Sequence, residues 1–184
     1  MSDFTRRTVV RGAAWTVPVV AVAANAPAFA ASQLPPPPFF DFDNAYKNPG
    51  NSCTSACIPK QSYGVPVTVT NPSLQDYFIQ FTSYSIDSTS VGVFGITTGI
   101  SGCPKAYTAF SAPACSVTGP ALTANNSVRI LPGQTLTLYV TSNSFGASPQ
   151  GGQAIGYRFV RVSDCAVSGS GTATSPVSPP NDAC

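Results

Sequence analysis

The sequence predicts an all-β protein: a single antiparallel sandwich of two sheets, braced by disulfides. Apolar and polar residues alternate with a period of two in several short segments, and Gly, Pro, Asn and Ser separate these segments. Beyond the first thirty residues no segment shows a helical period. The third observation is the even number of cysteines, six, which predicts the braces.

The first element is a signal peptide over residues 1–30. Three arginines precede the apolar segment 12–24 ("GAAWTVPVVAVAA"), although only 9% of the chain is charged, and a small-residue A-x-A site follows. The apolar segment is shorter than the roughly 20 residues of a membrane-spanning helix and contains Pro18. The signal arginines are Arg6, Arg7 and Arg11, and the cleavage-site residues are Ala28, Ala30 and Ala31.

The stretch "TRRTVVR" at residues 5–11 resembles the twin-arginine signals that export folded bacterial proteins, and the segment rich in Ala and Val is similar to those of actinobacteria. The resemblance implies twin-arginine translocation, with the export machinery as partner. Val9 stands where that family often has Phe, so the general secretory route is the alternative.

Cleavage after Ala30 also removes the basic excess. The whole chain carries a net charge of +2, and residues 1–30 contribute all of it, so the mature chain is formally neutral. A neutral chain has no phosphate-binding stripe, and we expect no nucleic-acid partner.

All six cysteines lie beyond the cleavage site, and an even number in an exported chain predicts three disulfides. A metal site is disfavoured because the chain has no histidine and no Cys-x-x-Cys pair. Six cysteines allow 15 pairings. We expect local ones: Cys53 with Cys57, Cys103 with Cys115, and Cys165 with Cys184.

Two segments flank the predicted domain of residues 39–167. Residues 31–38 contain four consecutive prolines, which predict an extended polyproline II linker. Residues 168–184 form a tail rich in Ser, Gly and Pro, which we expect to be irregular and fastened by Cys184.

The strands follow between these flanks. The Pro-Gly centre of Leu131–Gln134 predicts a type II turn between two of them. The expected strands lie at residues 39–46, 65–70, 77–86, 91–96, 127–131, 135–141 and 155–162.

The segments "YGVPVTVTNPS" (residues 63–73) and "LPGQTLTLYVTSN" (residues 131–143) resemble immunoglobulin-like modules of bacterial surface and secreted proteins. The resemblance implies an immunoglobulin-like sandwich. It carries over no functional residue.

The residue types argue against an enzyme. Without histidine or glutamate, Ser-His-Asp, Cys-His and histidine-ligated zinc sites are excluded, and we expect no catalytic residue, metal or cofactor. Asp41 and Asp43 would share one face of a strand about 7 Å apart, which keeps open a small hydrolase, although two acids that blunt an edge strand are the favoured interpretation. A Ser–Lys dyad with Lys47, Lys60 or Lys105 is a second alternative.

Binding is the favoured kind of function. Tyr77 and Tyr84 belong to an aromatic-rich strand, and regular alternation would expose some of its rings to a sugar or protein. A covered outer face, or a bulge that returns both sets of rings to the core, is the favoured alternative. Phe145 lies in the polar connection 141–153, a second candidate site.

We therefore expect a non-enzymatic module that is secreted or held in the cell envelope and that binds a protein or glycan, or has a structural role. We expect no membrane anchor after cleavage. A secreted inhibitor that presents Lys105 in a loop closed by Cys103 and Cys115 is a further alternative.

Overall fold

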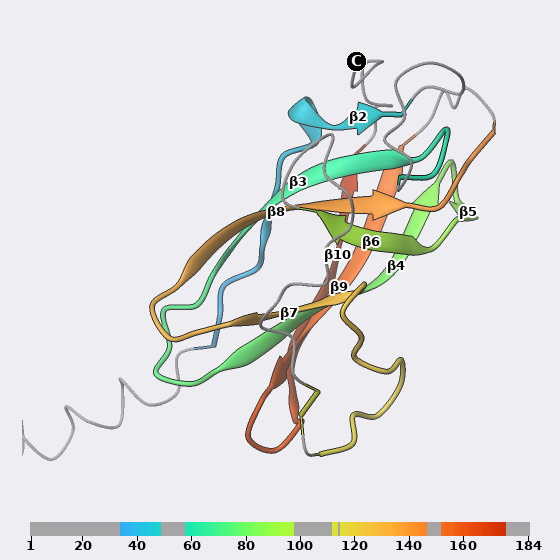
Figure 1. Cartoon of the computed structure of the whole chain (residues 1–184). Coiled ribbons are helices and arrows are strands. Elements are labelled where there is room, and N and C mark those ends of the chain that lie inside the picture. Colours follow the sequence, from blue (N-terminus) through green and yellow to red (C-terminus); the bar gives the residue numbers. More distant parts are fainter. Residues whose placement is uncertain (1–33, 49–57, 98–111, 114, 147–151, 176–184) are drawn as a thin grey trace, which may run out of the picture. The chain divides into compact units, whose positions relative to one another are not determined.

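The computed structural model describes residues 34–48, 58–97, 112–113, 115–146 and 152–175 (Figure 1). The chain divides into two compact units, Met1–Gln33 and Leu34–Cys184, and every described residue belongs to the second. The described part is all-β apart from one turn of 3-10 helix. Its elements are β1 (Phe39–Phe40), η1 (Phe42–Asn44), β2 (Tyr46–Lys47), β3 (Tyr63–Thr70), β4 (Tyr77–Ile86), β5 (Thr89–Ser90), β6 (Val93–Thr97), β7 (Ser127–Ile130), β8 (Thr135–Ser142), β9 (Gln153–Arg161) and β10 (Val167–Ser175).

Two antiparallel sheets form the sandwich that the sequence predicts (Figure 1). Sheet A has the order β1-β3-β8-β6, with β2 also pairing with β3. Sheet B has the order β10-β9-β4-β5, with β7 also pairing with β4. These orders correspond to the A-B-E-D and G-F-C sheets of an immunoglobulin fold, to which β5 and β7 add short pairings on β4.

The alternation predicted for β3 and β8 is confirmed. Thr68 faces Thr137 and Thr70 faces Thr135 on the outer face of sheet A, with hydroxyl oxygens 3.4 and 3.1 Å apart. The odd-numbered residues of β3 and the even-numbered residues of β8 face sheet B instead. The core between the sheets includes Val65, Val67 and Val69 of β3, Leu138 and Val140 of β8, Ile79 and Phe81 of β4, and Ile155 and Phe159 of β9.

The predicted turn at Leu131–Gln134 has the features that a type II turn requires. The Gln134 N–H donates to the Leu131 carbonyl at 3.1 Å, and Gly133 has a φ of 71°.

The irregular tail predicted for residues 168–184 is wrong over its first part. Residues 167–175 form β10, which pairs with β9 along its whole length, while residues 176–184 lie outside the described part. The ring of Tyr157 covers Gly171, where a Cβ would come within 2.7 Å of the Tyr157 hydroxyl. Glycine thus gives the neighbouring tyrosine room, and the ladder to β9 overrides its weak strand propensity.

The single strand expected at residues 39–46 is also wrong. Two short strands, β1 and β2, flank the helical turn η1. In the preceding linker, Pro35 and Pro38 are buried, so this end of the linker packs on the domain.

Candidate functional site

Tyr77 and Tyr84 do not form the exposed binding surface that regular alternation would give, since Tyr77 is 3% and Tyr84 0% exposed. The register between β4 and β9 shifts between Phe81 and Ser83. In a regular strand, residues an odd number of positions apart, such as Tyr77 and Tyr84, point to opposite faces. The bulge shifts the alternation by one residue, so both tyrosines lie on the inner face. Phe78, on the outer face, is covered as well. Both parts of the favoured alternative, a bulge and a covered face, are therefore confirmed.

Phe145 is half-buried and packs against the core. Its N–H donates to the Gln61 carbonyl at 3.0 Å, and the neighbouring Ser144 hydroxyl donates to the Lys60 carbonyl at 2.7 Å. These contacts fasten the start of the connection after β8 to the segment before β3.

Asp41 and Asp43 do not share a strand face. Asp41 is the N-cap of η1: its carboxylate accepts from the backbone N–H of Asn44 at 3.2 Å and from the Asn44 side-chain amide at 2.7 Å. Asp43 lies in the first turn of the helix and is exposed. The Asp41 carboxylate therefore stabilises a helical turn.

A cluster of polar contacts holds a segment that we call the strap, residues 115–122. The strap crosses the outer face of sheet B. Val117 and Leu122 of the strap pack on Phe78 of β4 and Val160 of β9. This packing covers the face that regular alternation would expose.

The strap is also fixed by a charge-assisted clamp. The Arg158 guanidinium, in a residue only 8% exposed, donates to the carbonyl oxygens of Thr118 at 2.6 Å and Pro120 at 2.7 Å. It also donates to the side-chain oxygen of Gln80 at 2.6 Å, and the Gln80 amide donates to the Ala121 carbonyl at 2.8 Å. Main-chain carbonyls and one amide oxygen thus satisfy a buried cation.

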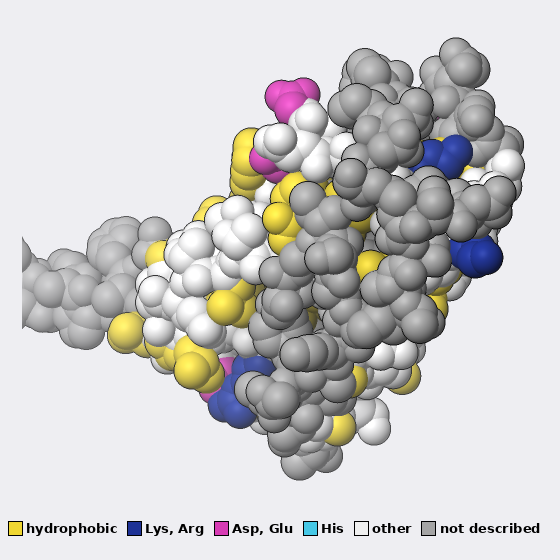
Figure 2. Space-filling model, turned by 45° about the horizontal axis from the view of Figure 1, so that its top comes forward, with side chains coloured by type: hydrophobic (Ala, Val, Ile, Leu, Met, Phe, Trp, Pro, Cys, Tyr) yellow, Lys and Arg dark blue, Asp and Glu magenta, His cyan; other side chains and the backbone are white. Residues whose placement is uncertain are grey.

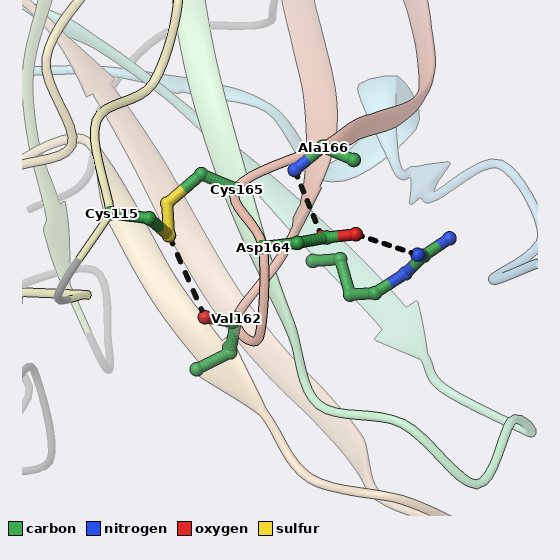
Figure 3. The surroundings of a disulfide bond; sticks show 6 residues. Cys115, Val162, Asp164, Cys165 and Ala166 are labelled. Atoms are coloured by element: carbon green, nitrogen blue, oxygen red, sulfur yellow. Dashed lines mark hydrogen bonds and ion pairs between the residues drawn. A yellow bond between two sulfur atoms is a disulfide. The ribbon is translucent and has the colours of Figure 1, made fainter.

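A disulfide fastens the start of the strap (Figure 3). Cys115 bonds to Cys165 in the turn between β9 and β10, with the two Cα atoms 5.8 Å apart. The predicted partners of these two residues, Cys103 and Cys184, are therefore wrong. The strap brings residues 50 positions apart together, and local spacing does not encode this contact. Cys53, Cys57, Cys103 and Cys184 lie outside the described residues, as does Lys105 of the proposed inhibitor loop.

Several hollows border sheet B. The hollow against the strap has a volume of about 290 Å³, and Pro113, Val117 and Leu122 are among its lining residues. Another, of about 230 Å³, lies at the end of β4, where Asp87 and Thr174 are among the lining residues. A third, of about 340 Å³, lies beside the start of β4 and is lined by Gln75, Asp76, Val162 and Ser163. Within the described ranges, no three His, Cys, Asp or Glu side chains converge as metal ligands would.

Buried tyrosines form a second polar group near the ends of β3 and β4. The Tyr84 hydroxyl donates to the Gln153 side-chain oxygen. Burial raises the pKa of Tyr84 well above its ordinary value, and burial together with the Asp87 charge raises the pKa of Tyr63 to about 12. Burial also raises the pKa of Tyr46, against the opposing effect of nearby threonine hydroxyls. These phenols stay neutral at physiological pH.

At the opposite end of the sandwich two turns lie together. The Asn71 N–H donates to the Gln134 carbonyl at 2.9 Å, and the Gly133 N–H donates to the Asn71 carbonyl at 2.7 Å. The turn after β3 is thereby joined to the turn before β8.

Three exposed leucines gather at this end, and we call them the leucine tip. Leu74 and Leu131 project from the two joined turns and are 73% and 48% exposed. Leu34, 50% exposed, belongs to the same end because β1 pairs with the last part of β3 in antiparallel register, Phe39 opposite Thr68. Figure 2 shows exposed hydrophobic side chains at this end of the domain, at the left of the view.

Sequence reasoning did not identify Arg158, Gln80 or the leucine tip. The sequence held a signal for Gln80 and for two of the three leucines. Gln80 interrupts an otherwise apolar and aromatic run, and Leu34 and Leu131 each stand directly before a proline. The signal residues Arg6, Arg7, Arg11, Ala28, Ala30 and Ala31 lie outside the described part.

The fold and the strap define a disulfide-containing antiparallel β-sandwich of immunoglobulin type. No protein-family model matches the chain, and no curated protein matches it at a significant level. In the part of the chain that the structure describes, no helix has the length and apolar character to cross a bilayer. The disulfide is compatible with a secreted protein.

Proposed function

We propose that the chain is an exported, non-enzymatic β-sandwich module of the cell envelope or medium that binds an envelope protein or glycan. The observation that carries the proposal is the strap. A buried arginine and a disulfide both hold a long surface connection against a sheet face. Such a doubly fixed connection suits a binding module, since binding surfaces on rigid scaffolds lose less conformational entropy on complex formation.

The uses of the polar side chains support this proposal over the hydrolase alternative. The Asp41 carboxylate is occupied as a helix cap, and the Lys47 ammonium lies 5.4 Å from the centre of the Tyr63 ring. Because the Asp41 carboxylate is used as a cap, Asp43 lacks the paired carboxylate that a glycosidase mechanism needs. No observation favours the inhibitor alternative, because Cys115 is bonded to Cys165 and does not close a loop with Cys103.

The proposal is tested by co-sedimentation of labelled protein with isolated cell envelopes. We expect saturable binding that unlabelled protein competes away and that the Asp41→Asn/Asp43→Asn double variant retains. Controls are envelopes treated with protease or with glycan-degrading enzymes, which assign the partner class. Absence of saturable binding, together with hydrolysis of ester or glycoside substrates that the double variant abolishes, would overturn the proposal in favour of the hydrolase.

A further inference from the structure

We propose that the leucine tip is a contact site for the interfacial layer of a phospholipid membrane, used while the N-terminal apolar segment holds the chain at the bilayer. The ligand class is lipid, and the contact goes beyond the binding of a protein or glycan proposed above. The chemistry of the tip, its position on turns and its distance along the chain from the apolar segment all favour lipid.

The chemistry of the tip suits lipid. Its three large side chains are aliphatic, and proline neighbours two of them directly in sequence. The nearest charges cancel, since the Arg129 guanidinium donates to the Asp76 carboxylate with its Nε 3.0 Å from the carboxylate oxygen. Insertion of the leucines therefore brings no uncompensated charge toward the hydrocarbon layer.

The leucines lie on projecting turns and not in a groove. Leu74 and Leu131 belong to two turns that hydrogen bonds hold together, so both are presented from one rigid end. A projecting aliphatic end can enter the boundary between headgroups and acyl chains. Protein interfaces are enriched in aromatic residues and arginine instead, and the two arginines near this end within the described part, Arg129 and Arg161, are each paired with an aspartate.

The length of the chain limits how far this end can lie from a signal segment bound to a membrane during export. The chain enters the described domain at Leu34, within the tip itself. The nine residues 25–33 separate the tip from the apolar segment 12–24, so the chain from residue 24 to Leu34 spans at most about 35 Å. While the apolar segment is bound to the bilayer, this tether raises the effective concentration of the tip at the lipid surface. A weak contact of three leucines then becomes effective.

The single tryptophan of the chain makes a direct test available. Trp15 lies in the signal, so Trp15→Phe provides a background without tryptophan. In the full-length chain, Leu74→Trp places a fluorescent reporter at the tip. Leu131→Trp is a second tip reporter, and Thr89→Trp is the matched control, because Thr89 is exposed but lies on β5, beyond the end of β4 that is far from the tip.

Each variant is mixed with vesicles of phosphatidylglycerol and phosphatidylcholine, without and with bromine on the acyl chains. We expect the emission of both tip reporters to shift to the blue and to fall about twofold with the brominated lipid, while the Thr89→Trp emission changes little. Replacing the other two leucines with serine should abolish the quenching of the Leu74→Trp reporter.

Three results would overturn the proposal. Equal quenching of the tip and control reporters would mean unspecific adsorption. Absence of quenching at both tip positions would exclude the tip as a lipid contact, whether or not the protein sediments with the vesicles. A blue shift at the tip that depends on protein concentration and not on lipid would assign the tip to a second copy of the chain. Pure lipid vesicles contain no protein or glycan partner, so this test can fail independently of the proposed function.

Discussion

Replacing Arg158 with methionine should release the strap from sheet B. Methionine keeps much of the length of the arginine stem but lacks every donor. The strap then loses the charge-assisted bonds to the carbonyl oxygens of Thr118 and Pro120, and Gln80 loses the donor to its side-chain oxygen.

The magnitude follows from where these acceptors lie. Thr118 and Pro120 are exposed, so their carbonyls regain water once the guanidinium is gone, whereas the Gln80 side chain is fully buried. An unsatisfied buried acceptor costs about 1–3 kcal/mol, and each lost bond to a charged donor about 1.5–3 kcal/mol. Removal of a buried charge returns part of this cost. We expect Arg158→Met to lower the free energy of unfolding by about 3 kcal/mol.

Urea unfolding followed by circular dichroism measures this loss. Arg129→Met is the matched control, because Arg129 also lies on a strand of sheet B but pairs with Asp76 near the surface, with 35% of its side chain exposed. A pair of this kind contributes about 0–1 kcal/mol. Amide hydrogen exchange gives the location: exchange over residues 115–122 should accelerate in Arg158→Met alone.

The conclusion that Arg158 holds the strap on sheet B would be refuted if Arg158→Met lost no more stability than Arg129→Met. It would also be refuted if Arg158→Met lost about 3 kcal/mol while exchange over the strap stayed unchanged, because the arginine would then stabilise something other than the strap.

Three further predictions concern stability. The Cys115→Ala/Cys165→Ala double variant should lose about 4 kcal/mol in urea unfolding, because the bond closes a loop with a sequence separation of 50; an unchanged midpoint would contradict this. Above pH about 10, the free energy of unfolding should fall by about 1.4 kcal/mol per pH unit for each tyrosine that ionises only when unfolded. Burial raises the pKa of Tyr46 and Tyr84, so the stability that their neutral phenols contribute is complete below that pH and is lost as the pH rises. Phenolate absorbance reports the ionisation, and a free energy of unfolding that stays constant from pH about 10 to 11 would contradict this prediction. Gly64→Ala should cost about 2 kcal/mol in thermal unfolding, since a Cβ would overlap the Tyr46 ring, and an unaltered melting temperature would show that the ring moves freely.

The parts of the fold that sequence predicted are those fixed by local alternation. Val65, Val67 and Val69 face the core together because a strand repeats every two residues, and the same holds for Leu138 and Val140 of β8. The Pro-Gly turn between β7 and β8 is equally local. These features depend on neighbouring residues only, and they suffice to define an all-β sandwich.

The tail was mispredicted because its strand depends on a partner. Residues 168–175 are mostly serine, glycine and threonine, and glycine ordinarily weakens a strand. Gly169 and Gly171 lie opposite Phe159 and Tyr157 of β9, whose rings pack against the small residues. The sequence of the tail alone does not reveal that these rings stand beside it.

The candidate site was missed for the same reason. Arg158 contacts Gln80, 78 residues earlier, and the strap lies between them in sequence. Cys115 and Cys165 meet only because the strap crosses sheet B, so local spacing favoured the wrong partners. The bulge in β4 likewise depends on pairing with β9, and it places Tyr84 in the core, where regular alternation would put it on the outer face.

The most direct test of the account is mass spectrometry of the protein recovered from culture medium and from washed cells, intact and after proteolysis without reduction. We expect a chain that begins at Ala31 and a disulfide-linked peptide pair that contains Cys115 and Cys165. A retained Met1, or Cys115 linked to Cys103, would contradict an exported module whose strap is fastened to the turn between β9 and β10.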